Sequence, residues 1–239
     1  MGKSENLIIN GSGSYPGGRY DKISIRGEGT IVNDVECSIF NVYGTSESVE
    51  NVTAGSVKII GEAEFQGNIE VKETLVMGTM KVDGKAYLKK VKILGLLEVG
   101  EKLSGDEATI KGSIVVNGDV EYERFDSSGD FEIKGLLTAD TIMVGLRFGQ
   151  SSAEEIGGGK ITVKRKKNSL FPFGKEVGFL TAKVIEGDDV YLENTKADIV
   201  RGNMVKIGPG CQIGLVEYTN ELAHDPSSTI KQSQKNKGE

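Results

Sequence analysis

The sequence predicts an all-β protein, a right-handed parallel β-helix whose rungs, the single turns of the helix, each hold about 17 residues in three short strands. A glycine recurs at every seventeenth position, and apolar residues alternate with polar ones between these glycines. A repeat of this period indicates rungs that pair in parallel with their neighbours, and parallel crossovers strongly favour the right hand. The recurring glycines are Gly27, Gly44, Gly61, Gly78, Gly95, Gly112 and Gly129.

Each rung is expected to bend at three corners. A second glycine column stands six residues after the first at Gly67, Gly84, Gly118 and Gly135, with Glu101 as the one exception inside that run. Glycine suits a corner that needs a positive φ or that leaves no room for a Cβ. The third corner is charged, as at Lys72 and Glu73, so we expect it to face solvent. The inward residues of the rung around Gly61 are expected to be Val57, Ile59, Ala63, Phe65, Ile69 and Val71.

Five segments follow one another along the chain. Residues 1–20 form an N-terminal arm, in which the run Leu7 to Ile9 is either a short cap strand or a weak membrane-contact tag. Residues 21–146 form the regular rungs, although Ser46 and Ser48 interrupt the apolar pattern. Residues 147–178 are predicted to be an insertion that contains one strand, in which Ile161 and Val163 alternate with polar residues, and a long excursion from the helix. Residues 179–218 are predicted to form further rungs, and residues 219–239 a disordered polar tail.

The composition excludes several classes of protein. With 33 glycines and only four prolines, the chain fits a solenoid better than a disordered polymer. The net charge of −6 and the lack of a repeating basic face argue against nucleic-acid binding. Two cysteines in apolar strand patterns are expected to be buried and reduced. No apolar run approaches the roughly 20 residues that span a bilayer, so we expect a cytoplasmic protein.

We expect no enzymatic activity, no cofactor and no metal site. The stretch from Gly157 to Lys160 lacks the Ser or Thr of a phosphate-binding loop and precedes a strand instead of a helix. His224 is the single histidine and lies in the polar tail. The outward column Glu64, Lys81, Glu98 mixes charges of both signs, unlike the clustered acids of a calcium-dependent lyase.

Two surface features indicate interaction sites. One is the apolar strip, an outward column formed by Tyr43, Ile60, Met77 and Leu94. Either the insertion or the N-terminal arm covers it, or it is a lateral contact in a filament or a contact with a partner protein. The second is a basic and aromatic segment that fits either an anionic membrane surface or a solvated hairpin tip. Its residues are Lys164, Arg165, Lys166, Lys167, Phe171 and Phe173.

The glycine and aliphatic repeat, together with two C-terminal motifs, resembles the bactofilins, which are bacterial polymer-forming cytoskeletal proteins. The motifs are Gly187-Asp-Asp-Val-Tyr-Leu-Glu193, and Ala197-Asp-Ile-Val-Arg-Gly202 followed by Ile207-Gly-Pro-Gly-Cys-Gln-Ile-Gly214, and they resemble the longer Firmicute-type members. The resemblance implies a right-handed β-helix that assembles end to end into nucleotide-independent filaments, often at the inner face of the membrane. It also implies a scaffold for envelope or appendage proteins. The chain differs from the compact members in residues 147–178 and in lacking a clear N-terminal membrane-targeting segment.

The ends of the predicted helix give a physical reason for assembly. A terminal rung exposes unpaired backbone groups and a slice of the core, and such edges pair with a matching partner. No amphipathic capping helix is visible at either end, so we expect self-association through apolar terminal rungs. The alternative is a capped adaptor that does not polymerise and binds a partner protein through the apolar strip. The residues expected in the terminal rungs are Ile23, Ile25, Ile31, Val205, Ile207, Ile213 and Val216.

Overall fold

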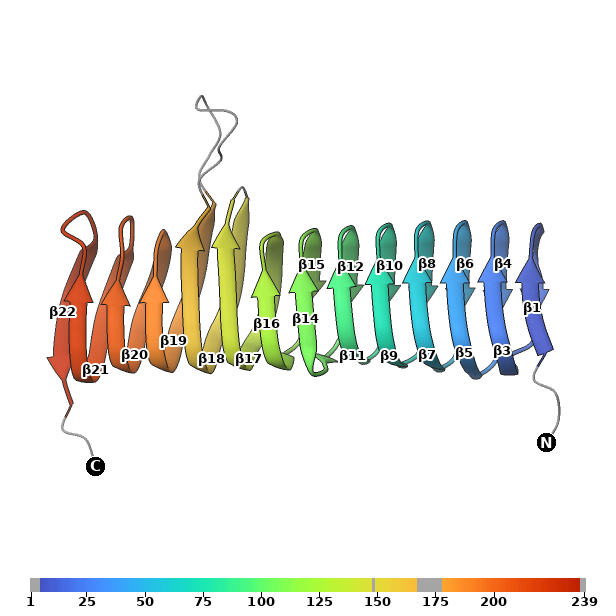
Figure 1. Cartoon of the computed structure of the whole chain (residues 1–239), viewed down its shortest axis with the longest axis horizontal. Helices are drawn as coiled ribbons and strands as arrows, with labels where there is room; N and C mark the ends of the chain where they lie inside the picture. Colours follow the sequence, from blue (N-terminus) through green and yellow to red (C-terminus); the bar gives the residue numbers. More distant parts are fainter. Residues whose placement is uncertain (1–4, 148, 167–177, 237–239) are drawn as a thin grey trace, which may run out of the picture. The chain divides into compact units, whose positions relative to one another are not determined.

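Figure 1 shows the computed structural model, which describes residues 5–147, 149–166 and 178–236. All regular secondary structure within these ranges is β-strand, and the strands pair in parallel. The predicted all-β class and the parallel β-helix are therefore confirmed. The chain divides into two compact units, unit 1 from Met1 to Gly118 and unit 2 from Asp119 to Glu239.

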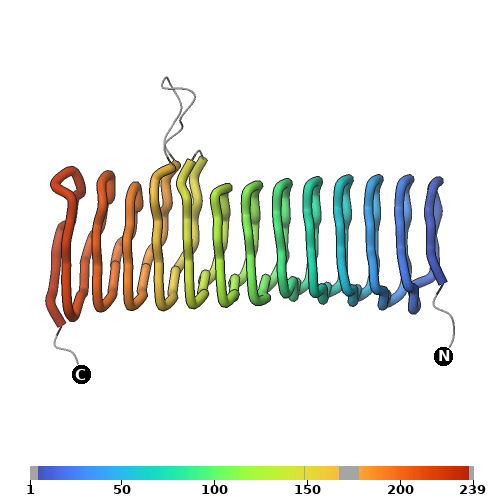
Figure 2. Tube along the Cα trace, viewed as in Figure 1, coloured from blue at the N-terminus to red at the C-terminus, as the bar shows by residue number. Residues whose placement is uncertain are grey.

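Through most of unit 1, a long strand alternates with a short one, and each such pair makes one rung. The Cα trace repeats the same path from one rung of this unit to the next (Figure 2). The strands are β1 (Glu5–Ile9), β2 (Ser12–Tyr15), β3 (Gly18–Ile25), β4 (Glu28–Ile31), β5 (Val35–Val42), β6 (Thr45–Ser48), β7 (Val52–Ile59), β8 (Glu62–Phe65), β9 (Ile69–Val76), β10 (Thr79–Val82), β11 (Ala86–Ile93), β12 (Leu96–Val99), β13 (Leu103–Ser104), β14 (Glu107–Ile110) and β15 (Ser113–Val116). In the last rung of this unit, β13 and β14 together take the place of the long strand and pair with β11.

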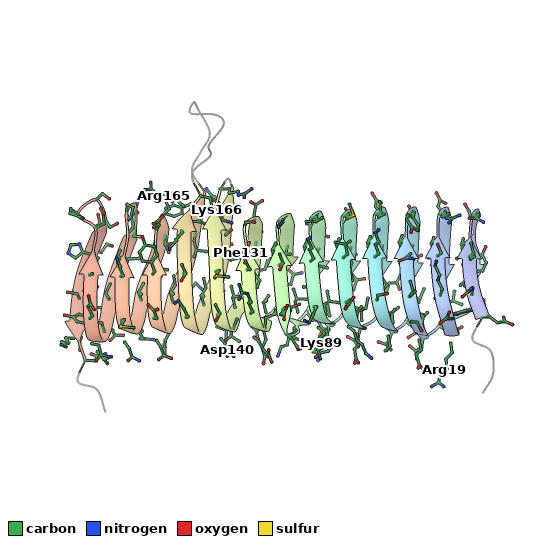
Figure 3. All side chains as sticks on the ribbon, viewed as in Figure 1. Arg19, Lys89, Phe131, Asp140, Arg165 and Lys166 are labelled. Atoms are coloured by element: carbon green, nitrogen blue, oxygen red, sulfur yellow. The ribbon has the colours of Figure 1, made fainter. Side chains whose placement is uncertain are left out.

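Residues that pair between the regular rungs of unit 1 are one glycine repeat apart in the sequence, as the glycine spacing predicts. Thr74 in β9, for example, lies opposite Val57 on one side and Val91 on the other. The predicted charged corner is a bend within each long strand. In β9, Lys72 and Glu73 are both exposed and Lys72 is left out of the strand ladder, so the inward alternation changes phase there. Lys89, in the equivalent bend of β11, points away from the strands (Figure 3).

The glycine column of unit 1 is required by close backbone approach. A Cβ on Gly61 would overlap the carbonyl oxygen of Gly44, and a Cβ on Gly78 would overlap that of Gly61. Positive φ angles occur elsewhere among the described glycines, at Gly18, Gly149 and Gly210. Of the two reasons expected for these corner glycines, lack of space for a side chain is therefore the correct one.

The interior of unit 1 is aliphatic, with a pair of aromatic rings beside two serines. Ser46 and Ser48 are buried, and neither hydroxyl has a hydrogen-bond partner in the described part of the chain. Ser48 lies opposite Phe65 in the next rung, and the Phe65 ring packs on Phe40 with centroids 5.8 Å apart. The two large rings supply apolar volume in the rungs where the serines interrupt the pattern.

A ladder of amide side chains runs along one corner of unit 1. The Oδ1 atom of Asp34 accepts hydrogen bonds from the backbone N–H and the side-chain Nδ2 of Asn51, at 3.0 and 3.1 Å. Asn51 accepts the equivalent pair from Asn68, and Asn68 accepts from the backbone N–H of Lys85. The ladder satisfies corner N–H groups that the strand pairing leaves free. Asp34, Asn51 and Asn68 occupy equivalent positions of successive repeats, so the ladder is visible in the sequence.

Unit 2 has longer strands and less regular rungs. Gln150 lies opposite Phe179, Leu180 opposite Thr195, and Gln212 opposite Thr229. The distance along the sequence between paired residues therefore differs from rung to rung. Phe125 and Phe131 pack edge to face in its core, with centroids 5.7 Å apart. The strands are β16 (Val120–Ser127), β17 (Asp130–Leu146), β18 (Gln150–Arg165), β19 (Phe179–Leu192), β20 (Thr195–Ile207), β21 (Gln212–His224) and β22 (Thr229–Lys235).

Within residues 147–178, the predicted strand with Ile161 and Val163 is present, but it is longer than expected, and residues 150–165 do not leave the helix. Strand β18 pairs in parallel with β17 on one side and with β19 on the other, so it is part of a rung. Its inward residues include Ser151 and Ala153, and it contains three consecutive glycines. These small residues weaken the apolar signal, whereas the backbone ladder does not depend on them. Residues 167–177 lie outside the described residues.

At the N-terminal end, Leu7 to Ile9 lie in β1, which pairs with β3, so the cap strand is the correct one of the two alternatives for this run. The segment expected to be an N-terminal arm also contains β2 and the start of β3, and Ile9 is buried. The prediction for the C-terminal end is wrong. The segment expected to be a disordered tail contains the end of β21 and all of β22, which pairs with β21 from Thr229 to Lys235. Terminal strands have a neighbour on one side only, so their side chains can be polar while their backbone remains paired.

Candidate assembly surfaces

The three apolar residues predicted to form the N-terminal end are interior residues of unit 1. Ile23, Ile25 and Ile31 are each 0% exposed. Strand β1 covers β3, with Leu7 opposite Ile23, and strand β2 covers β4, with Tyr15 opposite Ile31. The expected terminal position of these isoleucines is therefore wrong, because the chain forms one further rung before them.

The four residues predicted to form the C-terminal end are also buried. Val205 and Ile207 lie opposite Leu222 and His224 in the following rung. Ile213 and Val216 lie opposite Ile230 and Ser233 of β22. Their expected terminal position is wrong as well, because β21 and β22 extend the solenoid into sequence that is too polar to be recognised as strand.

The N-terminal face of unit 1 has open strand edges. Within the described residues, β1 pairs only with β3, and β2 pairs only with β4. The inward side chains on this face are apolar: Leu7 and Tyr15 are half-buried and Ile9 is buried. Ile8 points to the outside of the rung and is 55% exposed. The face therefore combines unpaired backbone groups with apolar side chains.

The C-terminal face of unit 2 is polar, and within the described residues its last strand, β22, pairs only with β21. Strand β22 has the sequence TIKQSQK, in which only one residue is aliphatic. Before it, the Asp225 carboxylate accepts hydrogen bonds from the backbone N–H and hydroxyl of Ser227, at 2.9 and 2.6 Å, which lowers the pKa of Asp225. Ser228 donates to the Gly208 carbonyl at 2.6 Å and accepts from the Cys211 N–H at 2.9 Å. This face has fewer apolar groups to offer a partner than the N-terminal face of unit 1.

The apolar strip is exposed on unit 1. Its residues stand immediately before the glycines of the corner column, and their exposed fractions are 45% for Tyr43, 40% for Ile60, 48% for Met77 and 39% for Leu94. The N-terminal segment, one of the two expected covers, is instead occupied in building the first rung. Within the other expected cover, residues 167–177 lie outside the described residues.

Charged residues surround the apolar strip. The same column carries Arg26 one rung before Tyr43 and Lys111 one rung after Leu94, and both are exposed. On the rung of Ile60, the outward neighbours are Lys58 on one side and Glu62 on the other. Neither Lys58 nor Glu62 has an ion-pair partner in the part of the chain that the structure describes.

The basic segment of unit 2 is partly tied down by its neighbours. Lys164, Arg165 and Lys166 are exposed, and Figure 3 shows Arg165 and Lys166 near the same edge of the strands. The ammonium groups of Lys164 and Lys206 lie 5.3 and 5.8 Å from the centroid of the Tyr191 ring. The other predicted members of this site, Lys167, Phe171 and Phe173, lie outside the described residues.

Glu193 organises this basic edge. The hydroxyl of Tyr191 donates to Glu193 Oε1 at 2.6 Å, and this hydrogen bond raises the pKa of Tyr191 to about 12. The backbone N–H of Arg165 donates to Glu193 Oε2 at 2.8 Å. One carboxylate thus contacts both the Tyr191 hydroxyl and the backbone of Arg165. The ammonium groups of Lys164 and Lys206 lie near the same tyrosine ring.

Unit 2 also contains a polar groove of about 650 Å³ that sequence reasoning did not identify. Gly158, Gly187 and Gly202 line it. Its charged groups pair with one another, since Arg201 Nε lies 2.6 Å from Glu217 and Arg201 Nη1 lies 3.4 Å from Glu186. The recurring glycines in three successive rungs were the available sequence signal.

The described residues contain no cluster of three or more His, Cys, Asp or Glu side chains arranged to hold a metal ion. They also contain no helix long and apolar enough to cross a membrane. His224 lies at the end of β21 and not in a disordered tail, and its ring nitrogen Nδ1 is 3.4 Å from the carbonyl oxygen of Asp225.

Comparison with known proteins finds similarity over almost the whole chain. The chain is 49% identical over 232 residues to "Uncharacterized protein YhbE" of Bacillus subtilis (strain 168), covering 97% of this chain and 98% of that protein. It is 50% identical over 101 residues to "Uncharacterized protein YhbF" of the same strain, covering 42% of each chain. No family model matches the chain, and no solved structure matches it.

Proposed function

The chain belongs to the same family as YhbE, and from this premise we propose that it is a bactofilin-like scaffold that self-assembles end to end into filaments without nucleotide. In this proposal its main partner is itself, and the filament positions envelope or appendage proteins. The protein acts in the cytoplasm, at the inner face of the cell membrane. The parallel solenoid fold and the C-terminal motifs from Gly187 to Glu193 and from Ile207 to Gly214 support the proposal.

The observation that carries the proposal is the open N-terminal face of unit 1. The free edges of β1 and β2 present backbone N–H and C=O groups that a strand of a second molecule can pair with. Burial of Leu7 and Tyr15 against that strand would add the apolar contribution, about 25 cal/mol per Å² of apolar surface. Both contributions come from groups already present on the folded chain, so assembly needs neither a nucleotide nor a metal ion.

Negative-stain electron microscopy of the purified full chain, without nucleotide, tests the proposal. Filaments or sheets are expected for the unaltered protein. Leu7→Lys should prevent them, because it places a charge where the inward side chain of β1 meets the next molecule. Ile8→Lys is the matched control: it adds the same charge at the adjacent position, but its side chain points outward, so its filaments should persist.

Two results would contradict the proposed interface. Filaments of Leu7→Lys as long as those of Ile8→Lys would show that the N-terminal face is not in the contact. Uniform small particles for the unaltered protein at every protein and salt concentration would exclude self-assembly itself. Circular dichroism of both variants checks that the β-structure is retained.

A second candidate function is a capped adaptor that binds a partner protein through the apolar strip. The polar sequence of β22 favours it, because lysines such as Lys231 and Lys235 on a terminal strand discourage pairing with another chain. Light scattering at rising protein concentration separates the two functions. A constant mass of one chain or two supports the adaptor, whereas a mass that grows with concentration supports the filament.

We also propose a peripheral membrane contact through Lys164, Arg165 and Lys166. These exposed cations fit an anionic lipid surface, where each contributes about 1 kcal/mol. Co-sedimentation with phosphatidylglycerol vesicles should exceed that with phosphatidylcholine vesicles. Replacing the three cations with alanine should remove the difference, and equal binding to both vesicle types would exclude this contact.

A further inference from the structure

The two flanks of the apolar strip differ in charge. On the side of the preceding strands, the outward neighbours of Ile60 and Leu94 are Lys58 and Lys92. On the side of the following strands, the outward neighbours of Arg26 and Ile60 are Glu28 and Glu62. Along the strip itself, the flank of the preceding strands therefore carries two lysines among neutral residues, and the flank of the following strands carries one carboxylate. The preceding flank is Asn41, Lys58, Leu75 and Lys92, and the following flank is Thr45, Glu62, Thr79 and Leu96.

The flanking charges of the strip are not used within the described molecule. Elsewhere on unit 1, outward charges pair between neighbouring rungs, as Lys81 does with Glu64 and Lys90 with Glu107. Lys58, Glu62 and Lys92 have no ion-pair partner among the described residues. A surface that brings a carboxylate to Lys58 and a cation to Glu62 would complete these pairs.

We propose that the apolar strip is a lateral interface between two copies of this chain, with unit 1 of one copy against unit 1 of the other and their rungs stacked in the same direction. The two copies are related by a two-fold axis parallel to the direction in which the rungs stack. The inference goes beyond the proposed end-to-end contact, and it rests on the proposed function only in that copies of this chain meet.

The charges select this orientation. A two-fold axis along the stacking direction puts the lysine flank of one copy against the carboxylate flank of the other, at the same rung. Lys58 then faces the partner's Glu62, and Arg26 lies beside the partner's Glu28, each pair occurring twice by symmetry. A two-fold axis across the stacking direction puts like flanks together, so that Lys58 no longer faces the partner's Glu62. Unlike charges thus meet only when the copies are parallel.

The periodicity of the strip selects a second copy as the occupant. Its side chains repeat once per rung, at the spacing of adjacent strands, about 4.8 Å. A second parallel solenoid presents side chains at the same spacing, so each strip residue can meet its counterpart on all four rungs from Tyr43 to Leu94. The exposed cations Arg26 and Lys111 end the apolar column and limit the contact to these rungs.

Cysteine cross-linking of the full chain tests both the contact and its direction. In a parallel pair, each strip residue faces its own copy, so Ile60→Cys alone and Met77→Cys alone should both form disulfide dimers with a mild oxidant. Tyr87→Cys is the matched control, because Tyr87 is 42% exposed but lies on another face of unit 1. Cross-linking at positions 60 and 77 should be at least about tenfold faster than at 87, since bound thiols have a high effective concentration.

Charge exchange tests the pairing of Lys58 with the partner's Glu62. In the Met77→Cys protein, Lys58→Glu alone and Glu62→Lys alone should each slow dimer formation by about threefold or more, because each puts like charges together. The double variant Lys58→Glu with Glu62→Lys exchanges the flanks and should restore the rate. A double variant as slow as the single variants would overturn the pairing.

Other outcomes overturn the proposal directly. Equal cross-linking at 60, 77 and 87, or none at 60 and 77, would show that the strip does not bind a second copy. Dimers that form only when Ile60→Cys protein is mixed with Met77→Cys protein would show an antiparallel pair. The same cross-linking in the Leu7→Lys protein separates the two contacts. Disulfide dimers without filaments would show that the lateral contact forms without the end-to-end contact. Filaments without disulfide dimers would show that only the end-to-end contact forms.

Discussion

At the scale of single residues, three buried hydroxyls that have no partner among the described residues mark where side chains limit stability. These are Ser46, Ser48 and Thr74. A buried hydroxyl without a hydrogen bond costs about 1 to 3 kcal/mol. Thr74 lies in an inward column between Val57 and Val91. Since both equivalent positions hold valine, a valine at position 74 should fit the same space.

Thr74→Val should raise the free energy of unfolding by about 1 kcal/mol, because it keeps the side-chain shape and removes the unsatisfied hydroxyl. Urea denaturation followed by circular dichroism measures the change. Thr74→Ser is the control: it keeps the hydroxyl and loses a methyl group, so it should be less stable than the unaltered protein. A lower stability of Thr74→Val would show that the hydroxyl is bonded in solution.

The two cysteines should resist thiol reagents until the protein unfolds. Burial raises the pKa of Cys37 to about 12 and also raises the pKa of Cys211. Near pH 8, little reactive thiolate forms in the folded state, whereas an unfolded cysteine ionises near pH 8.5. Reaction with a chromogenic disulfide reagent should be slow for the folded protein and complete within seconds in denaturant. Rapid reaction of the folded protein would contradict the burial.

The same pKa shift fixes the sign of a pH effect on stability. Above about pH 8.5 the unfolded Cys37 loses its proton while the folded thiol keeps it, so the folded state binds more protons. The free energy of unfolding should therefore fall as the pH rises from about 8.5 towards 12. Urea denaturation at pH 8 and pH 10 should show a smaller fall for Cys37→Ala than for the unaltered protein, and an equal fall in the two proteins would argue against this linkage.

At the scale of single elements, the corner glycines and the inward alternation define each rung. The alternation is readable in the sequence because the long strands of unit 1 repeat the same inward pattern in successive rungs. In strand β18 only the end with Ile161 and Val163 is readable in this way, because Ser151, Ala153 and three glycines replace the expected aliphatic residues in the rest. Its place is decided by backbone pairing with β17 and β19, which no side-chain pattern reports.

Gly78→Ala should be severely destabilising. Its Cβ would overlap the carbonyl oxygens of Gly61 and Ile60, and backbone atoms in a parallel ladder cannot move aside independently. We expect a loss of about 3 kcal/mol or more, the upper end of the range for overpacking, measured by thermal or urea unfolding. Gly157→Ala is the control, because the added Cβ would meet only side-chain atoms at ordinary contact distances. A loss of similar size in both variants would contradict the role of backbone contact.

At the scale of the whole molecule, the two proposed contacts depend on different physical terms. The end-to-end contact relies on backbone hydrogen bonds and the burial of Leu7 and Tyr15. The orientation of the lateral contact relies on exposed charges such as Lys58 and Glu62, which salt screens over about 3 Å at 1 M ionic strength. Salt should therefore separate the two contacts.

In 1 M sodium chloride, the slow cross-linking of Lys58→Glu in the Met77→Cys protein should approach the rate of the Met77→Cys protein itself, because the repulsion between like charges is screened. Filaments seen by electron microscopy should persist under the same conditions. A defect of Lys58→Glu that is unchanged in high salt would assign it to altered packing instead of charge.

The sequence by itself determined the all-β class, the period of the rungs and the outward direction of the apolar strip, because each depends on patterns that repeat many times. Whether the strip is covered was left open by the sequence, and its exposure comes from the structure. The ends of the solenoid could not be read in this way. Strands β1, β2 and β22 are held by backbone pairing on one side, which places little demand on side chains. Only the tertiary structure therefore decided that Ile23 and Ile213 are interior residues and that Leu7 lies on an open face. It also decided that the cations and carboxylates flanking the strip lie on opposite sides of one ridge, because a corner brings residues on either side of each glycine to the same surface.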